Sequence, residues 1–346
     1  MDHRTQLPRA LPRRQFLRMA GAAAVAAPVA ALGWQASAPA APVTGRPCGP
    51  DGRNVELHEL FADDVNIASV DGFTRGVVPA SRLDDPVIQP ELPWETYATY
   101  LYGTVLPDQA NGGYRMWYHT GRICYAHSDD GVHWEKPALG LNYIDGQDSN
   151  WVFNPTSTTA PELSSVLYEP DDPDPNRRYK MMFSTGNSFF NVAFSPDGMH
   201  WTEPSPTAVL RAGSEIANVV RDPATGLYLA YIRSEPAKAY PVGLSGRRRI
   251  ALCTSPDFLN WSAKTPMIDP DAIDDAWVTD PSVQRTEFYG MAGVPYAGQW
   301  LGLLPTFRVT EIISPHPSTQ SAFEGPIHCE LISSRDGQHW DRCSDR

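Results

Sequence analysis

The sequence predicts an all-β protein folded as a β-propeller of four-stranded antiparallel blades. The main observation is a turn pattern, S-x-D-[G/F]-x-x-W, whose four tryptophans stand 67, 60 and 79 residues apart. A second observation is that each copy follows a similar run of short apolar segments. Self-similarity at this spacing is the signature of a repeat architecture, in which each unit packs against its neighbours. The four copies occupy residues 128–134, 195–201, 255–261 and 334–340.

The chemistry of the pattern is that of a tight turn. Ser and Asp side chains accept hydrogen bonds from nearby backbone N–H groups, and Gly supplies a positive φ angle without steric cost. The tryptophan then starts the next strand and places a large apolar face between neighbouring sheets. We therefore assign the motif to structure, and predict no catalytic role for its Asp and His residues.

The segments before each turn define the rest of the repeating unit. An aromatic and apolar strand precedes each motif, a turn precedes that strand, and one further strand precedes the turn. Four antiparallel strands of this kind form one propeller blade. The predicted aromatic strands cover residues 114–118, 179–183, 228–232 and 300–304. The predicted blades cover residues 94–150, 151–212, 213–270 and 271–346.

The N-terminus has the pattern of an export signal. Paired arginines, Arg13 and Arg14, precede Phe16 and Leu17, and an alanine-rich run extends to Leu32. A basic stretch, a short apolar run and small-residue cleavage sites are typical of a signal peptide, and the paired arginines indicate the twin-arginine (Tat) route. We predict a Tat signal at residues 1–40, a linker at 41–64 and the propeller at 65–346. The expected location is secreted or periplasmic, with no membrane association after cleavage.

Charge and cysteine content exclude several classes of protein. The formal net charge is −12, which argues against nucleic acid as a partner because phosphate binding needs a basic face. The five cysteines include no C-x-x-C spacing, so a zinc site is not expected. Cys124, Cys253 and Cys329 lie in strand patterns and are expected to be buried thiols. We predict no metal and no cofactor, and expect a monomer.

The four turns, together with an acidic residue expected to open each innermost strand, resemble those of the five-bladed propeller glycoside hydrolases. That group contains invertases, levansucrases and arabinanases (families 32, 43, 62 and 68). Residues 255–261 are closest to its S-x-D-L-x-x-W form, and the resemblance covers about residues 65–346. It implies a carbohydrate substrate. Because the sequence ends six residues after Trp340, we expect the last blade to be missing or incomplete in this chain.

Glycoside hydrolysis needs two carboxyl groups, one a proton donor and the other a nucleophile or base. Each predicted unit offers a glutamate where its innermost strand begins, and four carboxylates in one pocket would raise some of their pKa values. These residues are Glu95, Glu162, Glu215 and Glu287. The resemblance implies that Glu287 is the acid and that Glu215 orients the sugar. The first blade offers Glu95 where those families carry an aspartate, which leaves a retaining and an inverting mechanism equally open.

Other residues near the strand starts complete the predicted site. Asp280 lies in the loop that enters the fourth blade and is a further catalytic candidate. Asp222, although it stands in an R-D-P sequence, is assigned to a hairpin turn. Aromatic side chains can stack on sugar faces, and an amide can bind a hydroxyl. The predicted substrate-binding residues are Trp94, Tyr97, Asn218, Trp277 and Tyr289.

Two alternatives remain open at this point. One is an inverting glycoside phosphorylase on the same fold, which would need a cluster of Arg, Lys or His beside one acid. The run Arg247-Arg248-Arg249 is a possible source of that cluster. The other is a sugar-binding or degenerate propeller without catalytic activity, whose carboxylates would stand too far apart for hydrolysis.

Overall fold

A computed structural model describes residues 60–74, 76, 81–95, 99–159, 161–186, 189–211, 216–234, 247–313 and 323–342. The predicted signal and most of the predicted linker lie outside these residues. The described part is built from strands, with one short 3-10 helix, Pro175–Arg177 (η2). No helix among the described residues has the length and apolar character needed to cross a membrane.

The first two sheets each contain four antiparallel strands in chain order. The first contains β1 (Tyr100–Pro107), β2 (Tyr114–His119), β3 (Ile123–Ser128) and β6 (Trp151–Phe153). The second contains β7 (Glu162–Tyr168), β8 (Tyr179–Ser184), β9 (Phe189–Ser195) and β10 (Leu210–Arg211). A separate two-stranded hairpin joins β4 (Tyr143–Ile144) to β5 (Gln147–Asp148).

The third and fourth sheets repeat this arrangement with one irregularity. The third contains β11 (Ala217–Arg221), β12 (Tyr228–Ser234), β13 (Arg249–Ser255) and β14 (Thr265–Ile268). The fourth contains β15 (Arg285–Phe288), β16 (Ala292–Tyr296), β17 (Gln299–Val309), β20 (Ile327–Ser334) and β21 (Trp340–Arg342). β15 and β16 pair with successive halves of β17 and together act as one interrupted inner strand. A small hairpin, β18 (Glu311–Ile312) with β19 (Phe323–Glu324), extends β17.

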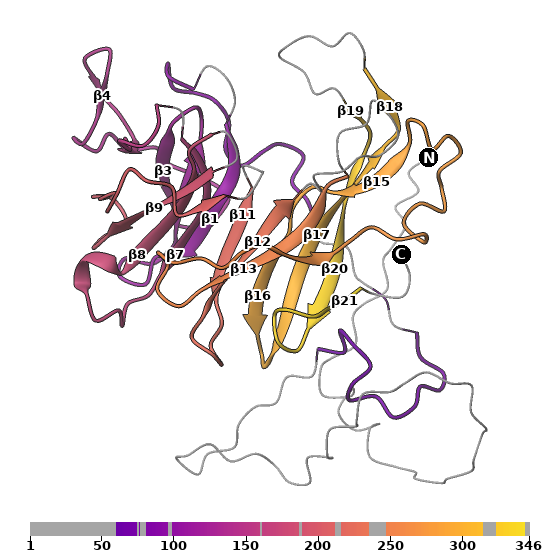
Figure 1. Cartoon of the computed structure of the whole chain (residues 1–346). Helices are drawn as coiled ribbons and strands as arrows, with labels where there is room; N and C mark the ends of the chain where they lie inside the picture. The colour runs from indigo at the N-terminus through magenta and orange to yellow at the C-terminus, as the bar shows by residue number, and fades with distance from the viewer. Residues whose placement is uncertain are drawn as a thin grey trace, which may run out of the picture. The chain divides into compact units, whose positions relative to one another are not determined.

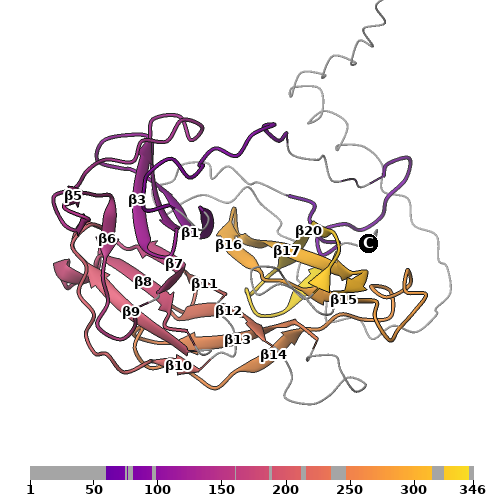
Figure 2. The same ribbon diagram turned by 90° about the horizontal axis from the view of Figure 1, so that it is seen from above.

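The sheets follow one another as blades of a propeller, which confirms the predicted fold class. The inner strands contact in sequence, β1 with β7, β7 with β11, and β11 with β16. Figure 2 shows these four strands next to one another, with the outer strands of each sheet leading away from them. Figure 1 shows the same order of sheets from the side. Every inner strand runs antiparallel to the next strand of its own sheet.

Apolar side chains fill the space between adjacent blades. Alternate residues of a strand point to opposite faces, so each central strand supplies two different cores. Trp117 and Tyr125 pack toward the second blade, whereas Tyr118 and Cys124 pack on the other face of the first blade. That other face is covered by Trp94 and by residues just before it. The fourth blade meets the third through Trp300, Leu304 and Ile332, among others.

The repeated turns form as predicted, but the expectation that the tryptophan starts the next strand holds only for Trp340. The outer strands of the first three blades begin later, at Trp151, Leu210 and Thr265. In each turn the Ser and Asp side chains accept hydrogen bonds from the following backbone N–H groups. The tryptophan indole N–H then bonds back to the carbonyl of the Gly or Phe three residues earlier, which closes the turn. Asp222 caps the β11–β12 hairpin through Ala224 and Thr225, as expected of a turn residue.

Adjacent blades are complementary at these turns. Trp117, the fourth residue of β2, donates a 2.8 Å hydrogen bond to the carbonyl of Gly198 in the next turn. Tyr231, the fourth residue of β12, does the same to Gly337. The fourth residue of β8 is Met182, whose side chain is thinner. The S-x-D turn of the next blade, the third, has Phe258 where the other turns have Gly. The Phe258 ring thus fills space that an aromatic side chain of the preceding blade fills elsewhere.

The strand starts define one face of the propeller, which we call the strand-start face. Pairings such as Glu162 with Ser184 and Arg285 with Val309 place the beginning of each inner strand beside the end of the second strand. The S-x-D turns lie at the opposite ends of the strands, since Ser128 pairs with Tyr114.

One cysteine prediction is wrong. Cys124 and Cys253 are buried, but Cys329 on β20 is exposed, as are its neighbours Ile327 and His328.

Candidate functional site

Two of the predicted carboxylates lie on the strand-start face, near the beginnings of two strands. Glu162 is the first residue of β7 and is partly exposed. Glu287 is the third residue of β15, and its side chain is 1% exposed. Both therefore come from the opening of an innermost strand, as predicted. Their catalytic roles stay predictions.

Glu287 is held by two arginine side chains. Arg248 donates from Nη1 to Oε2 at 2.6 Å, and Arg285 donates from Nε to Oε1 at 2.5 Å. The Arg285 side chain is 4% exposed and that of Arg248 is 16% exposed. A buried carboxylate is stable only when charges and hydrogen bonds compensate for its lost hydration. The two guanidinium groups supply that compensation.

Aromatic rings surround these charges. The Arg248 guanidinium carbon lies 5.6 Å from the ring centroids of both Tyr289 and Phe323. Arg285 lies 4.7 Å from the Phe323 centroid, and Arg233 lies 5.1 Å from that of Tyr289. Cations over ring faces at such distances are attracted by the ring quadrupole. We call Arg233, Arg248 and Arg285 the arginine cluster. Tyr289, a predicted substrate-binding residue, lies among these side chains.

Arg233 and Arg285 were not identified from the sequence. Both are among the buried charged residues of the protein. The available signal was their position inside apolar strand patterns, because arginine is almost never fully buried unless it is paired. Arg248 belonged to a basic run that was recognised, but nothing in the sequence linked that run to Glu287.

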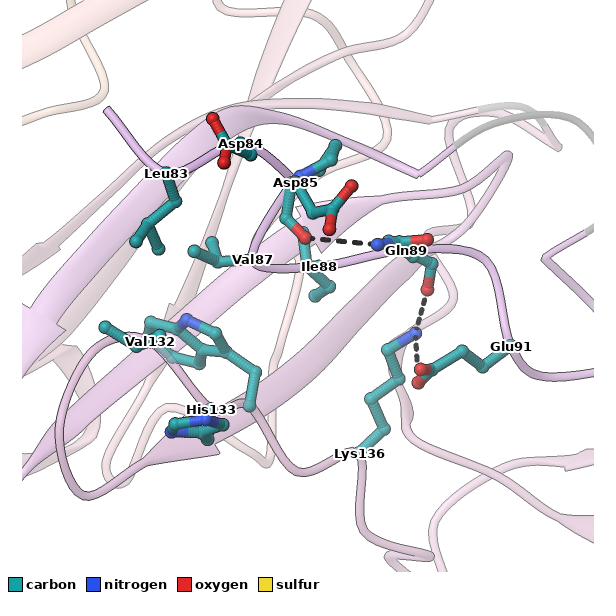
Figure 3. Close-up of a pocket in the computed structure, with 12 residues that line it drawn as sticks. Leu83, Asp84, Asp85, Val87, Ile88, Gln89, Glu91, Val132, His133 and Lys136 are labelled. Atoms are coloured by element: carbon teal, nitrogen blue, oxygen red, sulfur yellow. Dashed lines mark hydrogen bonds and ion pairs between the residues drawn. The ribbon is translucent and has the colours of Figure 1, made fainter. Parts of the chain in front are cut away.

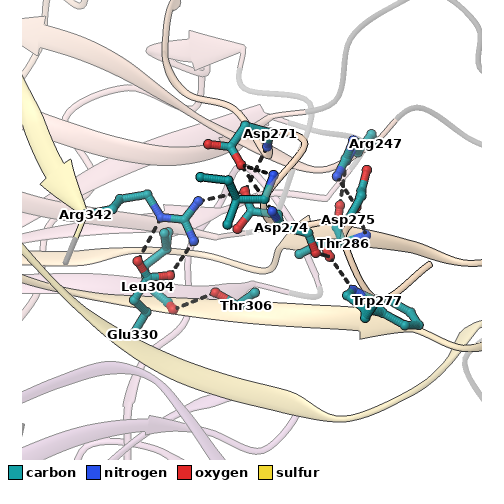
Figure 4. A network of polar contacts seen from close by, with 11 residues as sticks. Arg247, Asp271, Asp274, Asp275, Trp277, Thr286, Leu304, Thr306, Glu330 and Arg342 are labelled. Atoms are coloured by element: carbon teal, nitrogen blue, oxygen red, sulfur yellow. Dashed lines mark hydrogen bonds and ion pairs between the residues drawn. The ribbon is translucent and has the colours of Figure 1, made fainter. Parts of the chain in front are cut away.

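A polar network fixes the loop that enters the fourth blade (Figure 4). Asp275 accepts hydrogen bonds from the backbone N–H of Thr286 at 2.9 Å and from Nη2 of Arg247 at 2.7 Å. The Thr286 hydroxyl donates to the carbonyl of Asp274 and accepts from the indole N–H of Trp277 at 2.9 Å. These contacts orient Trp277, a predicted sugar platform, against the start of β15.

Asp280 lies in an exposed turn of the same loop. Its side chain accepts hydrogen bonds from the hydroxyl and the backbone N–H of Ser282. The Ser282 hydroxyl and then its backbone N–H lower the Asp280 pKa below its ordinary value. A carboxylate of this kind is a turn cap and stays ionised at neutral pH.

Glu95 does not open an innermost strand, and that expectation is wrong. β1 begins at Tyr100, and Glu95 instead lies in a turn that packs against the other face of the first blade. Its Oε1 accepts from the Tyr118 hydroxyl at 2.6 Å, and its Oε2 accepts from Lys136 at 2.8 Å. Burial acts to raise the Glu95 pKa, but these and two backbone hydrogen bonds outweigh it and lower the pKa. The turn satisfies Glu95 inside the fold because four donors converge on it.

The remaining predicted residues are placed as follows. Trp94 is buried and donates its indole N–H to Oδ1 of Asn150 at 3.1 Å. Asn218 on β11 accepts from the backbone N–H of Gly293, which links two inner strands. Glu215 and Tyr97 lie outside the described residues.

His119 is a further residue of the strand-start face, at the end of β2. Its Nε2 accepts from the backbone N–H of Gly121 at 3.1 Å, and its buried Nδ1 has no hydrogen-bond partner among the described residues. Burial lowers its pKa to about 4. The ring lies tilted against that of Tyr100, with the two ring centroids 4.8 Å apart. A lone histidine in a strand pattern is interpreted from the sequence as a packing residue, because nothing in the pattern distinguishes it as a site residue.

A cavity of about 490 Å³ opens elsewhere, between residues 83–91 and the first S-x-D turn (Figure 3). Val132, His133, Trp134 and Lys136 line one side. Lys136 reaches across to the carbonyl of Gln89 and to the Glu91 carboxylate. None of the residues predicted for catalysis or substrate binding lines this cavity. Within the described stretches, no group of three His, Cys, Asp or Glu residues is arranged to hold a metal ion.

Strand topology defines a β-propeller in which β7 opens with Glu162 and β15 opens with Arg285 and carries Glu287. No protein-family model and no curated protein matches the sequence. Among solved structures, the chain is similar to an α-L-arabinofuranosidase (CtGH43) from Clostridium thermocellum, with 12% identity, 69% and 70% of the two chains covered and a TM-score of 0.44.

Two further solved structures are similar at the same level. One is a protein of the GH130 family of mannoside phosphorylases, a family containing hydrolases that target β-1,2-mannosidic linkages in Candida mannan. It shows 14% identity, 79% and 81% coverage and a TM-score of 0.46. The other is an N-acetylgalactosamine deacetylase from F. plautii, with 14% identity, 69% and 67% coverage and a TM-score of 0.44. Similarity at this level does not transfer residue roles from one protein to another.

Proposed function

We propose that this protein is a secreted enzyme that cleaves a glycosidic bond at the strand-start face. The observation that carries the proposal is the placement of Glu162 and Glu287 at the openings of two inner strands. Cleavage of a glycoside needs two carboxyl groups that face one site. Aromatic side chains on the same loop and strand, Trp277 and Tyr289, supply surfaces on which a sugar ring stacks.

The environments of the two carboxyl groups suggest different roles. Glu287 is engaged as a carboxylate in two ion pairs, which suits a base or a nucleophile. Glu162 is partly exposed at the strand end, where it can approach a leaving oxygen, and we assign it the role of proton donor. This assignment differs from the role of Glu287 as acid that the family resemblance implies. Glu215 and Asp280 remain further candidates.

The test is turnover of aryl furanosides and pyranosides, fructans and arabinans by the purified chain beside Glu162→Gln and Glu287→Gln. Loss of a positioned acid or base costs about 10²–10⁴-fold in rate, so each variant should lose turnover by about that factor. Glu135→Gln is the matched control, because the Glu135 side chain is 80% exposed near an S-x-D turn. Glu287→Asp, which keeps the charge, and a circular dichroism spectrum separate loss of function from loss of fold.

Two results would contradict the proposal. Unchanged turnover in both glutamine variants would remove these carboxylates from the reaction. A folded wild-type protein that binds sugars but turns over none of the panel would instead favour a binding propeller.

An inverting glycoside phosphorylase is a second candidate, favoured by one specific observation. Arg248 and Arg285 lie beside one acid, Glu287, which is the arrangement that phosphate recognition requires. The same substrate panel, measured with and without inorganic phosphate, separates the two reactions. A hydrolase releases free sugar without phosphate, whereas a phosphorylase needs phosphate and releases a sugar phosphate.

A further inference from the structure

The most unusual charged group on the strand-start face is Arg285. Its Nε is bonded to Glu287 and its Nη1 lies 3.3 Å from the carbonyl of Val283. Its third nitrogen, Nη2, is buried and has no hydrogen-bond partner in the described part of the chain. A buried charged donor without an acceptor is destabilising, so this nitrogen needs an acceptor that the chain itself does not provide there.

Arg248 brings a second guanidinium group to the same point. The carbonyl of Arg248 accepts a 3.0 Å hydrogen bond from the backbone N–H of Phe288, which fixes the start of β13 beside β15. Its side chain keeps 16% of its surface exposed, so the cluster has contact with solvent. Glu287 bonds to both guanidinium groups and holds their planes in place. Two oriented guanidinium groups form the fork that binds planar or tetrahedral oxyanions.

The surrounding rings strengthen such an interaction. Tyr289, Phe307 and Phe323 lie within 6.0 Å of the Arg248 guanidinium carbon. Apolar surroundings lower the local dielectric constant and so increase the attraction between a guanidinium group and an anion. The rings also present apolar surface to a sugar that carries the anion.

We propose that Arg248 and Arg285 form an oxyanion subsite, which binds either the carboxylate of an acidic sugar or a phosphate ion next to the bond that is cleaved. The position of this subsite in the reaction rests on the proposed function, but anion binding itself does not. In this arrangement Glu287 is also a positioning residue, because it orients both arginines.

Anion binding is measured directly on the full chain by isothermal titration calorimetry at constant ionic strength. The probes are inorganic phosphate, D-glucuronate and, as the neutral control, D-glucose. We expect one of the two anions to bind and glucose to bind at least tenfold more weakly. Binding of phosphate alone identifies a phosphate subsite, and binding of glucuronate alone identifies an acidic-sugar subsite.

Variants then connect binding to the cluster. Arg248→Gln and Arg285→Gln should each weaken anion binding by about tenfold or more, since a charge-assisted hydrogen bond contributes at least that much. Arg249→Gln is the matched control at the residue next to Arg248, because Arg249 pairs with the half-exposed Asp269 outside the cluster. Arg285→Lys keeps a positive charge, and is used if the glutamine variant fails to fold.

The results separate this inference from the proposed function. The subsite would be overturned if neither anion bound to the protein. It would also be overturned if wild type and both glutamine variants bound an anion equally well. Turnover of glycosides by a protein that binds neither anion would leave the enzyme proposal standing while removing the subsite. Anion binding that is lost in the variants, in a protein that cleaves no glycoside, would support the subsite and contradict the proposed function.

Discussion

Arg335 forms a two-bonded ion pair with Asp63, with Nε to Oδ2 and Nη2 to Oδ1 both at 2.7 Å. The Ser333 hydroxyl also donates to the carbonyl of Ala62. These contacts attach the segment before the first blade to the outer part of the fourth blade. The same segment continues to Trp94, which covers the first blade. Residues ahead of the repeats therefore link the first and last described blades.

This link predicts a measurable contribution to stability. Arg335→Ala should lower the free energy of unfolding by about 1–3 kcal/mol, because it leaves the buried Asp63 carboxylate without its charged partner. Urea unfolding measures the change, with Arg82→Ala, at an exposed position of the same segment, as control. Equal stability of wild type and Arg335→Ala would show that the ion pair does not help to hold this segment on the fourth blade.

Glu95 should stabilise the fold through its charge. Glu95→Gln leaves the Lys136 ammonium, whose side chain is 5% exposed, without its buried partner, and should cost about 3 kcal/mol at pH 7. The folded-state pKa of Glu95 lies below its ordinary value of 4.5. The stabilisation is therefore complete above pH 4.5 and is lost as the pH falls through the folded-state value.

Unfolding curves at pH 7 and at pH 3 test the direction of this pH dependence. The difference between wild type and Glu95→Gln should narrow at the lower pH. Glu91→Gln is a matched control, since Glu91 faces the same lysine at 3.5 Å with a side chain 70% exposed. It should change stability by less than about 1 kcal/mol at either pH. A gap for Glu95→Gln that widens on acidification would contradict the assigned network.

His119 should stabilise the fold in its neutral form, whereas Glu95 stabilises it in its charged form. Its pKa falls from an ordinary 6.5 to about 4 because the ring is buried. Between these values the unfolded chain binds a proton that the folded chain does not, so stability decreases as the pH falls from 6.5 to 4. The loss reaches about 3 kcal/mol. His119→Gln should remove this part of the pH dependence, whereas His133→Gln, with a side chain 88% exposed, should keep it.

Phe258 and Met182 should be energetically coupled. Phe258 has a φ angle of 69°, where glycine is normally preferred, and is fully buried. Phe258→Gly removes a buried ring and should cost about 3–5 kcal/mol, while Met182→Trp alone overpacks the core at a cost of about 1–3 kcal/mol. The double variant recreates the pairing of Trp117 with Gly198, so its loss should be smaller than the sum. Additive losses in urea unfolding would refute this complementarity.

Local chemistry explains why the fold was predictable. Each S-x-D turn is closed by atoms within seven residues, and aromatic strands repeat before it, so the blades could be recognised without any long-range information. Glu162 and Glu287 were likewise placed at strand openings because the repeat fixed where the inner strands start. Glu95 was misplaced, since the repeat begins only at Tyr100 and the turn before it has no counterpart in the other blades.

The sequence by itself determined the repeating unit, its turns and its architecture, because these depend on residues that are neighbours along the chain. Only the tertiary structure decided which charges meet. Arg248 and Glu287 are 39 residues apart, and Arg335 and Asp63 are 272 apart. Such pairs form where separate blades pack, and their geometry depends on how buried guanidinium and carboxylate groups are compensated. No pattern along the chain records that compensation, so the arginine cluster became visible only in the folded protein.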